Sequence, residues 1–260
     1  MASLGVIGNI SIDTTRYPDG RTHILIGGAA LYVSLAAGRA GALARPVAVI
    51  GDDLGELPQT LDLTHVSRVT RPTCRFEIAY GTEGQIAALT SDYGAATELT
   101  THALAVLNEA TCDLWHVCCR RPLAVSPILE RLVDTRQPFS LDFHIASATE
   151  QISAAKSALP FAEVIFVNTA EYRLLKGLVA VGELKTMVVS DGPREVRLIQ
   201  SGRIVGTHIP ERRSAVEVTG AGDTLAGTFL AACLQGASKP SALATAVGAA
   251  TQQVCHPVFL

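Results

Sequence analysis

Towards its carboxy terminus the chain reads Val218-Thr219-Gly220-Ala221-Gly222-Asp223-Thr224-Leu225-Ala226-Gly227 and then continues as an apolar run typical of a helix. The first turn of a helix presents backbone N–H groups without partners inside the helix, and the helix dipole adds positive potential there. Small residues before the acid let a phosphate come close to those groups. Asp223 then lies where an attacking hydroxyl must lose its proton, so the stretch indicates phosphoryl transfer.

The same residues also allow a simpler interpretation, in which Asp223 is the N-cap of an ordinary helix. Their surroundings favour the first interpretation, because residues 217–223 resemble the carboxy-terminal signature of the ribokinase-like (PfkB) carbohydrate kinases, Asp-Thr-x-Gly-Ala-Gly-Asp. Glu217 and Val218 depart from its first two positions. The resemblance implies that Asp223 is the catalytic base and that the anion hole for the transferred phosphoryl group is formed by Gly220, Ala221 and Gly222.

The composition predicts one substantial core. Of 260 residues, 48% are hydrophobic and 17% charged, which fits a single α/β domain over residues 1–260. The net charge of −3 argues against a nucleic-acid partner, and the sequence shows neither a signal peptide nor a membrane span. The six cysteines have no zinc-binding spacing and fall mostly in apolar runs. We therefore expect a reduced, cytoplasmic protein.

Short apolar runs alternate with helix-like runs along the chain. This alternation predicts an α/β fold with a doubly wound, mostly parallel sheet and helices on both faces. The expected strands are residues 4–7, 47–50, 114–118, 139–141, 164–167 and 187–190. The expected helices are residues 29–40, 100–108, 124–134, 149–157, 171–176, 224–234 and 241–254.

One segment breaks the alternation. Residues 74–80 and 85–90 are strand-like runs joined by Gly81-Thr82-Glu83-Gly84, which predicts a β-hairpin. An edge hairpin of the main sheet is one interpretation. In the resembled family this region belongs to a small lid over the substrate that often forms the dimer contact. The resemblance thus implies a small β-hairpin lid formed from about residues 14–26 and 72–91, and a homodimer through it is an expectation.

Substrate-binding residues are expected after the first strand, because ligands of open parallel sheets bind beyond the carboxyl ends of the strands. Asp13 lies there, and the family binds substrate with an Asp at this place; a loop cap is the alternative role. Ser11, in the same segment, is a further expected substrate-binding residue. Gly27 and Gly28 match a glycine pair that lets substrate approach the backbone in ribokinase-like enzymes.

Two further residues bear on the substrate. Tyr32 stands where sugar-specific members of the family often have the Asn of Gly-x-Asn, so an amide is replaced by an aromatic face with one hydroxyl. This favours a flatter acceptor, such as a nucleoside. Arg75, near the lid, is either a solvated charge or a cleft residue that binds a phosphate.

The segment Asn168-Thr169-Ala170-Glu171 has two interpretations that are compatible with each other. It is typical of a helix start with Asn168 as N-cap and Glu171 at the third position. It also matches the family's Asn-x-x-Glu motif, which organises Mg²⁺ largely through water. Because Mg²⁺ keeps most of its water shell, Asn168 and Glu171 suffice as a metal site.

By resemblance, ATP lies along a groove beside the carboxy-terminal helices. The expected nucleotide-binding residues are Asn168, Ser190, Gly192, Thr219, Gly222 and Ala249. Glu195 stands where the family has the second glycine of a phosphate-contacting Gly-x-x-Gly loop, which puts the loop geometry in question. Asp142 and His144 match an Asp-x-Asn segment with His in place of Asn, and we expect no direct catalytic role for either.

The resulting prediction is an ATP- and Mg²⁺-dependent kinase that phosphorylates a primary hydroxyl of a sugar or nucleoside. Two alternatives remain open. The acceptor could be a nucleoside or an inositol-type polyol rather than a sugar, which Tyr32 favours slightly. Alternatively, Glu195, Glu217 and the absent Gly-x-Asn would suit a ligand-binding regulatory relative with weak activity.

Overall fold

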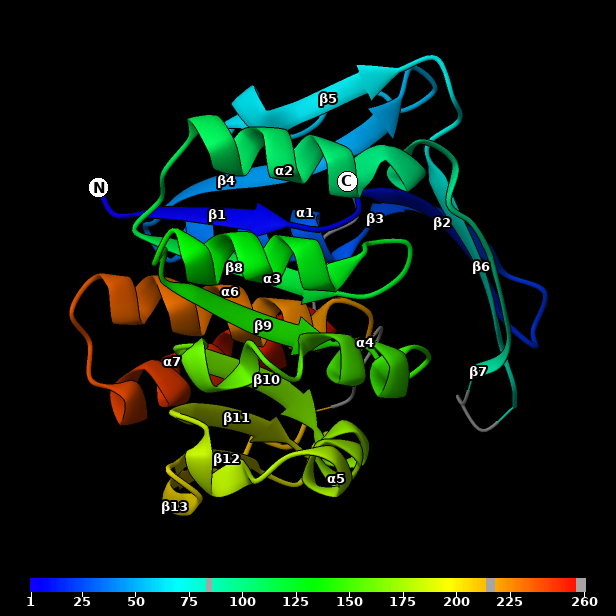
Figure 1. Cartoon of the computed structure of the whole chain (residues 1–260). Helices are drawn as coiled ribbons and strands as arrows, with labels where there is room; N and C mark the ends of the chain where they lie inside the picture. The colour runs from blue at the N-terminus through cyan, green and yellow to red at the C-terminus, as the bar shows by residue number, and fades with distance from the viewer. Residues whose placement is uncertain (83–85, 214–217, 256–260) are drawn as a thin grey trace.

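A nine-stranded sheet forms the centre of the molecule (Figure 1). The computed structural model describes residues 1–82, 86–213 and 218–255. The strand order is β13-β12-β11-β10-β9-β8-β1-β4-β5, and all neighbours run parallel except β11-β12 and β12-β13. The bounds are β1 Ser3–Ile7, β4 Leu43–Gly51, β5 Val66–Val69, β8 Leu114–Cys119, β9 Phe139–Phe143, β10 Val164–Asn168, β11 Thr186–Ser190, β12 Val196–Gln200 and β13 Arg203–His208.

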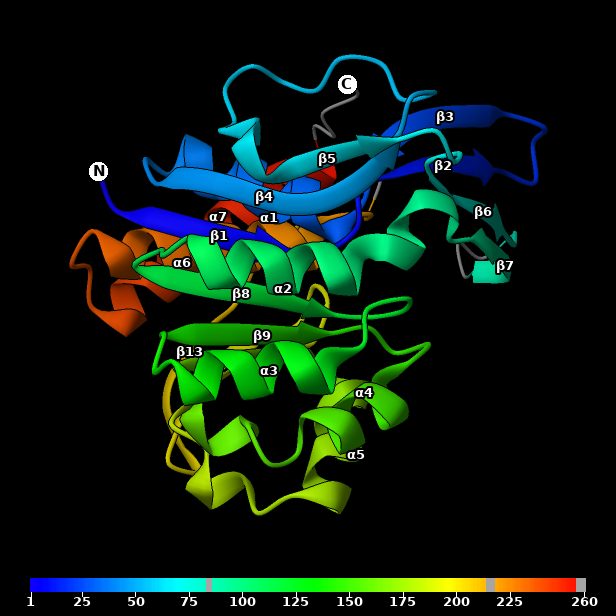
Figure 2. The same cartoon turned by 45° about the horizontal axis from the view of Figure 1, so that its top comes forward.

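Helices cover both faces of this sheet, as Figures 1 and 2 show. One face packs against α2 Leu99–Glu109, α3 Val125–Asp134, α4 Ala148–Ala155 and α5 Thr169–Leu178. The other face packs against α1 Ala29–Arg39, α6 Ala221–Leu234 and α7 Lys239–Cys255. The central strands β8 and β9 are buried along their whole length, because each of their faces lies under helices. The predicted doubly wound α/β fold is confirmed.

A second sheet stands beyond the carboxyl ends of the central strands, at the right of Figure 1. Its order is β3-β2-β6-β7, with β2 Ser11–Arg16, β3 Thr22–Gly27, β6 Cys74–Tyr80 and β7 Ile86–Asp92. The predicted hairpin therefore belongs to a separate small sheet and not to an edge of the large one. Three residues of the expected hairpin segment, Glu83, Gly84 and Gln85, lie outside the described residues.

Helices α1 and α6 pack closely because α6 carries a glycine at the contact. A Cβ added at Gly227 would lie 2.2 Å from the carbonyl oxygen of Val33 and 3.0 Å from the Cβ of Ala36. The first of these distances is impossible for real atoms, and the oxygen belongs to backbone that cannot turn aside. Gly227 therefore fixes how near α6 comes to α1.

We expect Gly227→Ala to lower the free energy of unfolding by about 1–3 kcal/mol, the usual cost of overpacking. The matched control is Gly248→Ala in α7, where a Cβ would meet nothing within 4 Å. That change should be neutral or stabilise by up to about 1 kcal/mol, because alanine is the better helix former. Urea denaturation of both variants measures the difference. Equal changes in the free energy of unfolding would mean that α1 and α6 can move apart at little cost.

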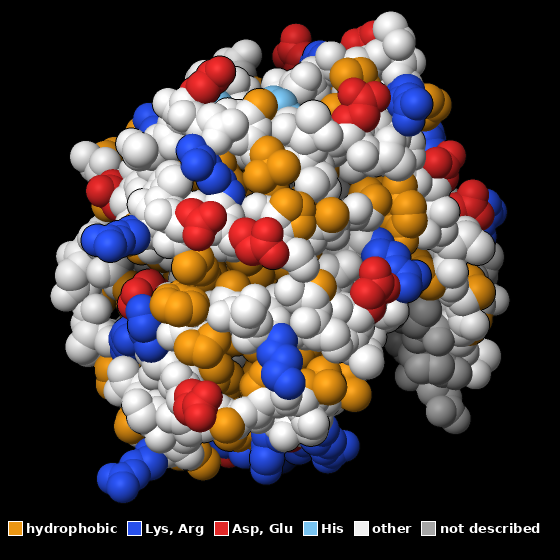
Figure 3. Space-filling view, in the orientation of Figure 1, with side chains coloured by type: hydrophobic (Ala, Val, Ile, Leu, Met, Phe, Trp, Pro, Cys, Tyr) orange, Lys and Arg blue, Asp and Glu red, His pale blue; other side chains and the backbone are white. Residues whose placement is uncertain are grey.

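Three strands of the large sheet were not predicted: β5, β12 and β13. Strand β13 has mostly exposed side chains at the sheet edge, so its sequence lacks the apolar run of a buried strand. Within the described ranges, no helix combines the length and apolar character needed to cross a membrane. On the face in Figure 3, positively and negatively charged side chains are interspersed, which accords with a net charge of −3.

Candidate active site

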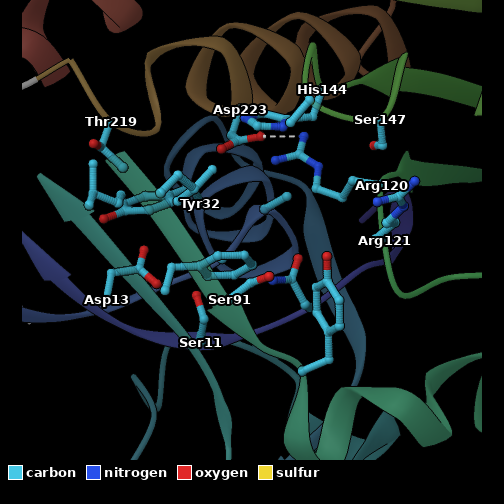
Figure 4. A pocket seen from close by; sticks show the side chains of 18 residues that line it. Ser11, Asp13, Tyr32, Ser91, Arg120, Arg121, His144, Ser147, Thr219 and Asp223 are labelled. Carbon is cyan, nitrogen blue, oxygen red and sulfur yellow. Dashed lines mark hydrogen bonds and ion pairs between the residues drawn. The ribbon is translucent and has the colours of Figure 1, made fainter. Parts of the chain in front are cut away.

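A cavity of about 320 Å³ lies between the small sheet and the amino-terminal end of α6. Its lining residues come from distant parts of the chain (Figure 4). They are Asn9, Ser11, Asp13, Gly28, Ala29, Tyr32, Phe76, Ile78, Leu89, Ser91, Tyr93, Arg120, Arg121, His144, Ala146, Ser147, Thr219 and Asp223. The fold thus gathers the expected residues Ser11, Asp13, Gly28, Tyr32, Thr219 and Asp223 around one space.

Asp223 occupies the first turn of α6, as predicted. Gly220 is the N-cap and has a left-handed φ of 77°, a conformation that glycine adopts without strain. The Ala221 N–H donates to the Val218 carbonyl at 3.3 Å. Among the described residues, this leaves the N–H groups of Gly222 and Asp223 as the available donors of the turn. The alternative interpretation of Asp223 as the N-cap is wrong, because Gly220 holds that position.

Arg120 contacts two carboxylates at once. Its Nη2 donates to Asp142 and lies 3.2 Å from Oδ1 of Asp223, as the dashed line in Figure 4 shows. Burial raises the pKa of Asp223, while Arg120 opposes that shift and the Asp142 carboxylate adds to it. Although burial lowers the pKa of Arg120, the two carboxylates hold it above its ordinary value. Asp223 is therefore a mostly buried carboxylate whose charge is balanced by a permanent cation.

Asp13 reaches the cavity from β2 because the next strand leaves room for it. A Cβ at Gly27 would lie 2.1 Å from Oδ2 of Asp13, so a larger residue at position 27 would displace the Asp13 carboxylate. Oδ1 of Asp13 has no hydrogen-bond partner among the described residues. Burial raises the pKa of Asp13 to about 6, and the Asp223 carboxylate adds to the shift. Such a buried acceptor points to a ligand hydroxyl.

Gly28 and Gly220 allow close backbone contacts on either side of the cavity. Gly28 has a φ of 99°, and a Cβ there would lie 2.4 Å from the Asn9 carbonyl oxygen. A Cβ at Gly220 would lie 2.9 Å from the ring of Tyr32. The Tyr32 ring, from α1, therefore supports the loop that begins α6.

The small sheet supplies a mostly apolar wall. Phe76, Ile78, Leu89 and Tyr93 line it, with the Ser91 hydroxyl among them. The sheet also contacts the signature stretch, because the hydroxyl of Tyr80 lies 3.5 Å from Oγ1 of Thr219. Figure 4 shows the Ser91 side chain across the cavity from Asp223.

Arg75 does not line this cavity. Its Nη2 lies 2.7 Å from Oδ2 of Asp53, and its side chain is largely exposed. Of the two interpretations of Arg75, the structure favours a surface charge held by Asp53.

The predicted metal and nucleotide residues gather at the ends of β10 and β11. Asn168 and Ser190 are register partners there. Asn168 caps α5, and Glu171 completes a capping box by accepting the Asn168 N–H at 2.8 Å. Burial raises the pKa of Glu171 to about 7, although the Asn168 N–H lowers it. The capping interpretation is confirmed, and the carboxylate stays close to Asp142 and Arg120.

Glu171→Gln should change how stability depends on pH. In the unfolded chain Glu171 ionises near its ordinary value of 4.5, whereas in the fold it ionises near 7. Between these values the unfolded state has lost a proton that the folded state keeps, so stability falls as pH rises. Between pH 5 and pH 7.5, removing this group should lessen the fall in the free energy of unfolding by roughly 2 kcal/mol, at 1.36 kcal/mol per pKa unit. Urea denaturation at pH 5 and pH 7.5 measures it, and parallel curves would contradict the prediction.

Gly192 and Ala249, two further expected nucleotide-binding residues, do not line the cavity. Gly192 has a φ of 56° in the turn between β11 and β12, and Glu195 in that turn pairs with Arg197 at 3.3 Å. The Glu195 carboxylate thus has a cation of its own. Ala249 is half-buried on α7, which packs against β12 and β13. Glu217, the signature departure, lies outside the described residues.

Arg120, Asp142 and His144 were not recognised as site residues. Arg120 lies 103 residues from Asp223 in the chain, and the two meet only because β8 ends beside α6. One signal was available: Arg120 and Arg121 follow the predicted strand 114–118 after one residue, at the sheet edge where ligands bind. His144 lines the cavity beside Asp223 (Figure 4).

Comparison with known proteins places the chain in a family. The model of the pfkB family carbohydrate kinases matches residues 1–257. A cytidine kinase of Thermococcus kodakarensis is 28% identical over 255 residues, covering 91% of this chain and 90% of that protein.

Two solved structures share the fold. A nucleoside kinase of Burkholderia thailandensis in complex with inosine has a TM-score of 0.82 at 18% identity, covering 99% of this chain and 92% of that one. A ribokinase of Cryptococcus neoformans in complex with ADP has a TM-score of 0.75 at 18% identity, covering 98% and 94%.

The fold and the gathered site define a phosphotransferase that acts on a small hydroxyl-bearing molecule. The chain belongs to the pfkB family of carbohydrate kinases, since the family match spans nearly its whole length. Both the recognition of the family from the signature stretch and the prediction of a kinase are confirmed.

Proposed function

We propose that this kinase transfers the γ-phosphate of ATP to the primary hydroxyl of a nucleoside. The observation that carries the proposal is one cavity in which two buried carboxylates, Asp13 and Asp223, face an apolar wall of Phe76, Ile78 and Tyr93. The hydroxyls of a sugar ring need hydrogen-bond acceptors, which Asp13 offers. A flat nucleobase needs an apolar surface, which the wall offers. The cytidine kinase relative and the inosine-bound neighbour support the same class of acceptor.

In this proposal each residue has a defined task. Asp13 accepts hydrogen bonds from the ribose hydroxyls, and Gly28 lets the ring approach the backbone. Asp223 accepts the proton of the primary hydroxyl as that oxygen attacks the phosphorus. The N–H groups of Gly222 and Asp223 stabilise the charge on the transferred phosphoryl group.

Arg120 has a second task in the proposal. In the structure its guanidinium balances Asp223. A transferred phosphoryl group beside Asp223 would lie within reach of the same guanidinium, which binds phosphate as readily as carboxylate. Arg120 would then stabilise the transferring group and release the base to take up the proton.

The residues also fit a magnesium nucleotide. Glu171 is a buried carboxylate fixed by the Asn168 backbone, so it can hold ordered water around Mg²⁺ without moving. Mg²⁺ would supply neutralisation of the phosphate charges. Ser190, Gly192, Thr219 and Ala249 remain our proposed contacts to the nucleotide.

The small sheet is our proposed lid, and its β3 edge our proposed dimer contact. Ile24 on β3 is 70% exposed although it is a large apolar residue. Sedimentation equilibrium of wild type and Ile24→Lys tests the dimer. A wild-type protein that stays monomeric at all concentrations would refute it.

Formation of ADP tests the proposed reaction. The panel comprises cytidine, inosine, adenosine, ribose, fructose and myo-inositol, each with Mg·ATP. We expect nucleosides to exceed free sugars in kcat/KM by at least about tenfold. This ratio is equivalent to ~1.4 kcal/mol of binding free energy from the nucleobase. Faster turnover of a sugar or of inositol would favour those acceptors. Tight binding of one compound without ADP formation would favour the regulatory alternative.

A further inference from the structure

Four polar side chains form a square inside the core, beneath the α6 face of the sheet. Strands β8 and β9 run parallel in a register that sets His116 beside Ser140 and Cys118 beside Asp142. Residues two apart on a strand point to the same face, so all four side chains share one face. His116, Cys118 and Ser140 are 0% exposed, and Asp142 is 7% exposed. We call these four residues the polar square.

Hydrogen bonding leaves two acceptors of the polar square facing each other. The Ser140 hydroxyl lies 2.9 Å from Nδ1 of His116 and 3.3 Å from the Trp115 carbonyl oxygen. When the hydroxyl donates to that carbonyl, it accepts from Nδ1–H, and Nε2 of His116 then carries a lone pair. It lies 3.7 Å from Oδ1 of Asp142, and neither atom has a hydrogen-bond partner among the described residues. Two buried lone pairs in this position are unfavourable unless a proton or a metal cation lies between them.

Cys118 completes a set of metal ligands. Nitrogen, sulfur and oxygen atoms of His116, Cys118 and Asp142 all lie within 4.8 Å of one another. Around a tetrahedral zinc ion with bonds of 2.0–2.3 Å, such atoms would be about 3.3–3.8 Å apart. Small side-chain rotations close this difference. Ser140 already holds the far nitrogen of the imidazole, as the outer partner of a metal-bound histidine does.

We propose that the polar square binds one thiophilic divalent cation, with His116, Cys118 and Asp142 as its ligands. On binding, the thiol of Cys118 loses its proton to solvent and the sulfur binds as thiolate. This site differs from the magnesium site proposed above, because Mg²⁺ prefers oxygen ligands and a thiolate and an imidazole favour Zn²⁺ or Cd²⁺.

The charges around the polar square suit such a cation. The Cys118 thiolate and the carboxylates of Asp142 and Asp223 would balance the cation together with Arg120. The second oxygen of Asp142 already accepts from Arg120, so Oδ1 remains for the metal. The ligands come from neighbouring strands, which explains why no zinc spacing is visible along the sequence.

A cation here would inhibit phosphoryl transfer, a consequence that rests on the proposed function. A cation bound to Asp142 repels the Arg120 guanidinium and weakens the ion pair between Arg120 and Asp142. Arg120 then pairs more closely with Asp223, 3.2 Å away, and lowers its readiness to accept a proton. Cation binding itself depends on none of these steps, so binding and inhibition are tested separately.

The binding experiment uses Cd²⁺ as the probe and the full-length protein. The half-buried thiols Cys233 and Cys255 are first replaced by Ser to remove alternative sites. We expect one equivalent of Cd²⁺ to bind with a thiolate-to-cadmium absorption band in the ultraviolet. Cys118→Ala should remove the band and weaken binding by at least about 100-fold, since loss of an outer partner alone costs 10–100-fold.

The matched control is Cys119→Ala. Cys119 is equally buried, but its thiol faces the opposite side of the sheet and donates to the Val117 carbonyl at 3.4 Å. This variant should bind Cd²⁺ as the parent does. Circular dichroism verifies that both variants fold; His116→Gln replaces Cys118→Ala if the latter does not.

Three outcomes would overturn the site: no Cd²⁺ bound by the folded parent, unchanged binding in Cys118→Ala, or equal loss in both cysteine variants. In the activity assay, Cd²⁺ should inhibit the parent and Cys119→Ala but spare Cys118→Ala. Cd²⁺ binding without inhibition would retain the site and refute its link to Arg120. Absence of kinase activity would leave the binding result intact.

Discussion

Asp223→Asn is expected to lower kcat by at least about 10²-fold, the usual contribution of a general base. The amide keeps the shape of the side chain and can still accept a hydrogen bond from Arg120, but it cannot take up a proton. Because Arg120 keeps the Asp142 carboxylate as a partner, the isosteric replacement of Asp223 should leave the fold intact. ADP formation under saturating Mg·ATP and acceptor measures the loss.

The control for this variant is Glu163→Gln, the same chemical change at an exposed carboxylate paired with Lys185. Its turnover should equal that of wild type. Thermal unfolding of both variants separates a catalytic loss from a folding defect. An Asp223→Asn enzyme with wild-type turnover would remove Asp223 from the mechanism.

The second large effect is expected at Asp13. Asp13→Asn should reduce kcat/KM for the acceptor by about 10–100-fold, because hydrogen bonds to a charged group contribute about 1.5–3 kcal/mol. The change should appear mainly as a raised KM, since Asp13 holds the acceptor and does not react. Initial rates at varied acceptor concentration, with Mg·ATP saturating, separate the two parameters.

The acceptor KM should also depend on pH through Asp13. The carboxyl is ionised above its pKa of about 6, so the KM of wild type should rise as pH falls through that value. In Asp13→Asn this rise should disappear. Asp19→Asn, an exposed carboxylate at the tip of the small sheet, is the control and should behave as wild type. An unchanged KM in Asp13→Asn would mean that Asp13 does not bind the acceptor.

Local patterns predicted most of the fold. Buried parallel strands appear as continuous apolar runs, so the six central strands were visible in the sequence. The position of Asp223 was predictable too, because small residues before an acid mark the start of a helix. Strands β12 and β13 were missed, since an antiparallel edge need not be apolar on both faces.

The chemistry around Asp223 was only partly predictable. A motif reports residues near one another in sequence, and Asp13, Asp223 and Glu171 each lie in such a motif. Arg120 and Asp142 acquire their roles from the pairing of β8 with β9 and from the approach of α6. The local sequence shows that Arg120 follows a strand and that Asp142 matches a motif, but it does not show that they meet Asp223.

The contact between the Tyr32 ring and Gly220 has a consequence for how this enzyme could change its substrate. Tyr32 lines the acceptor side of the cavity, yet its ring also supports the loop that precedes the base. A smaller side chain at position 32 would widen the acceptor space and at the same time leave that loop unsupported. Evolution or design of a new acceptor preference therefore has an easier route through Phe76 and Ser91, which line the cavity from the other sheet.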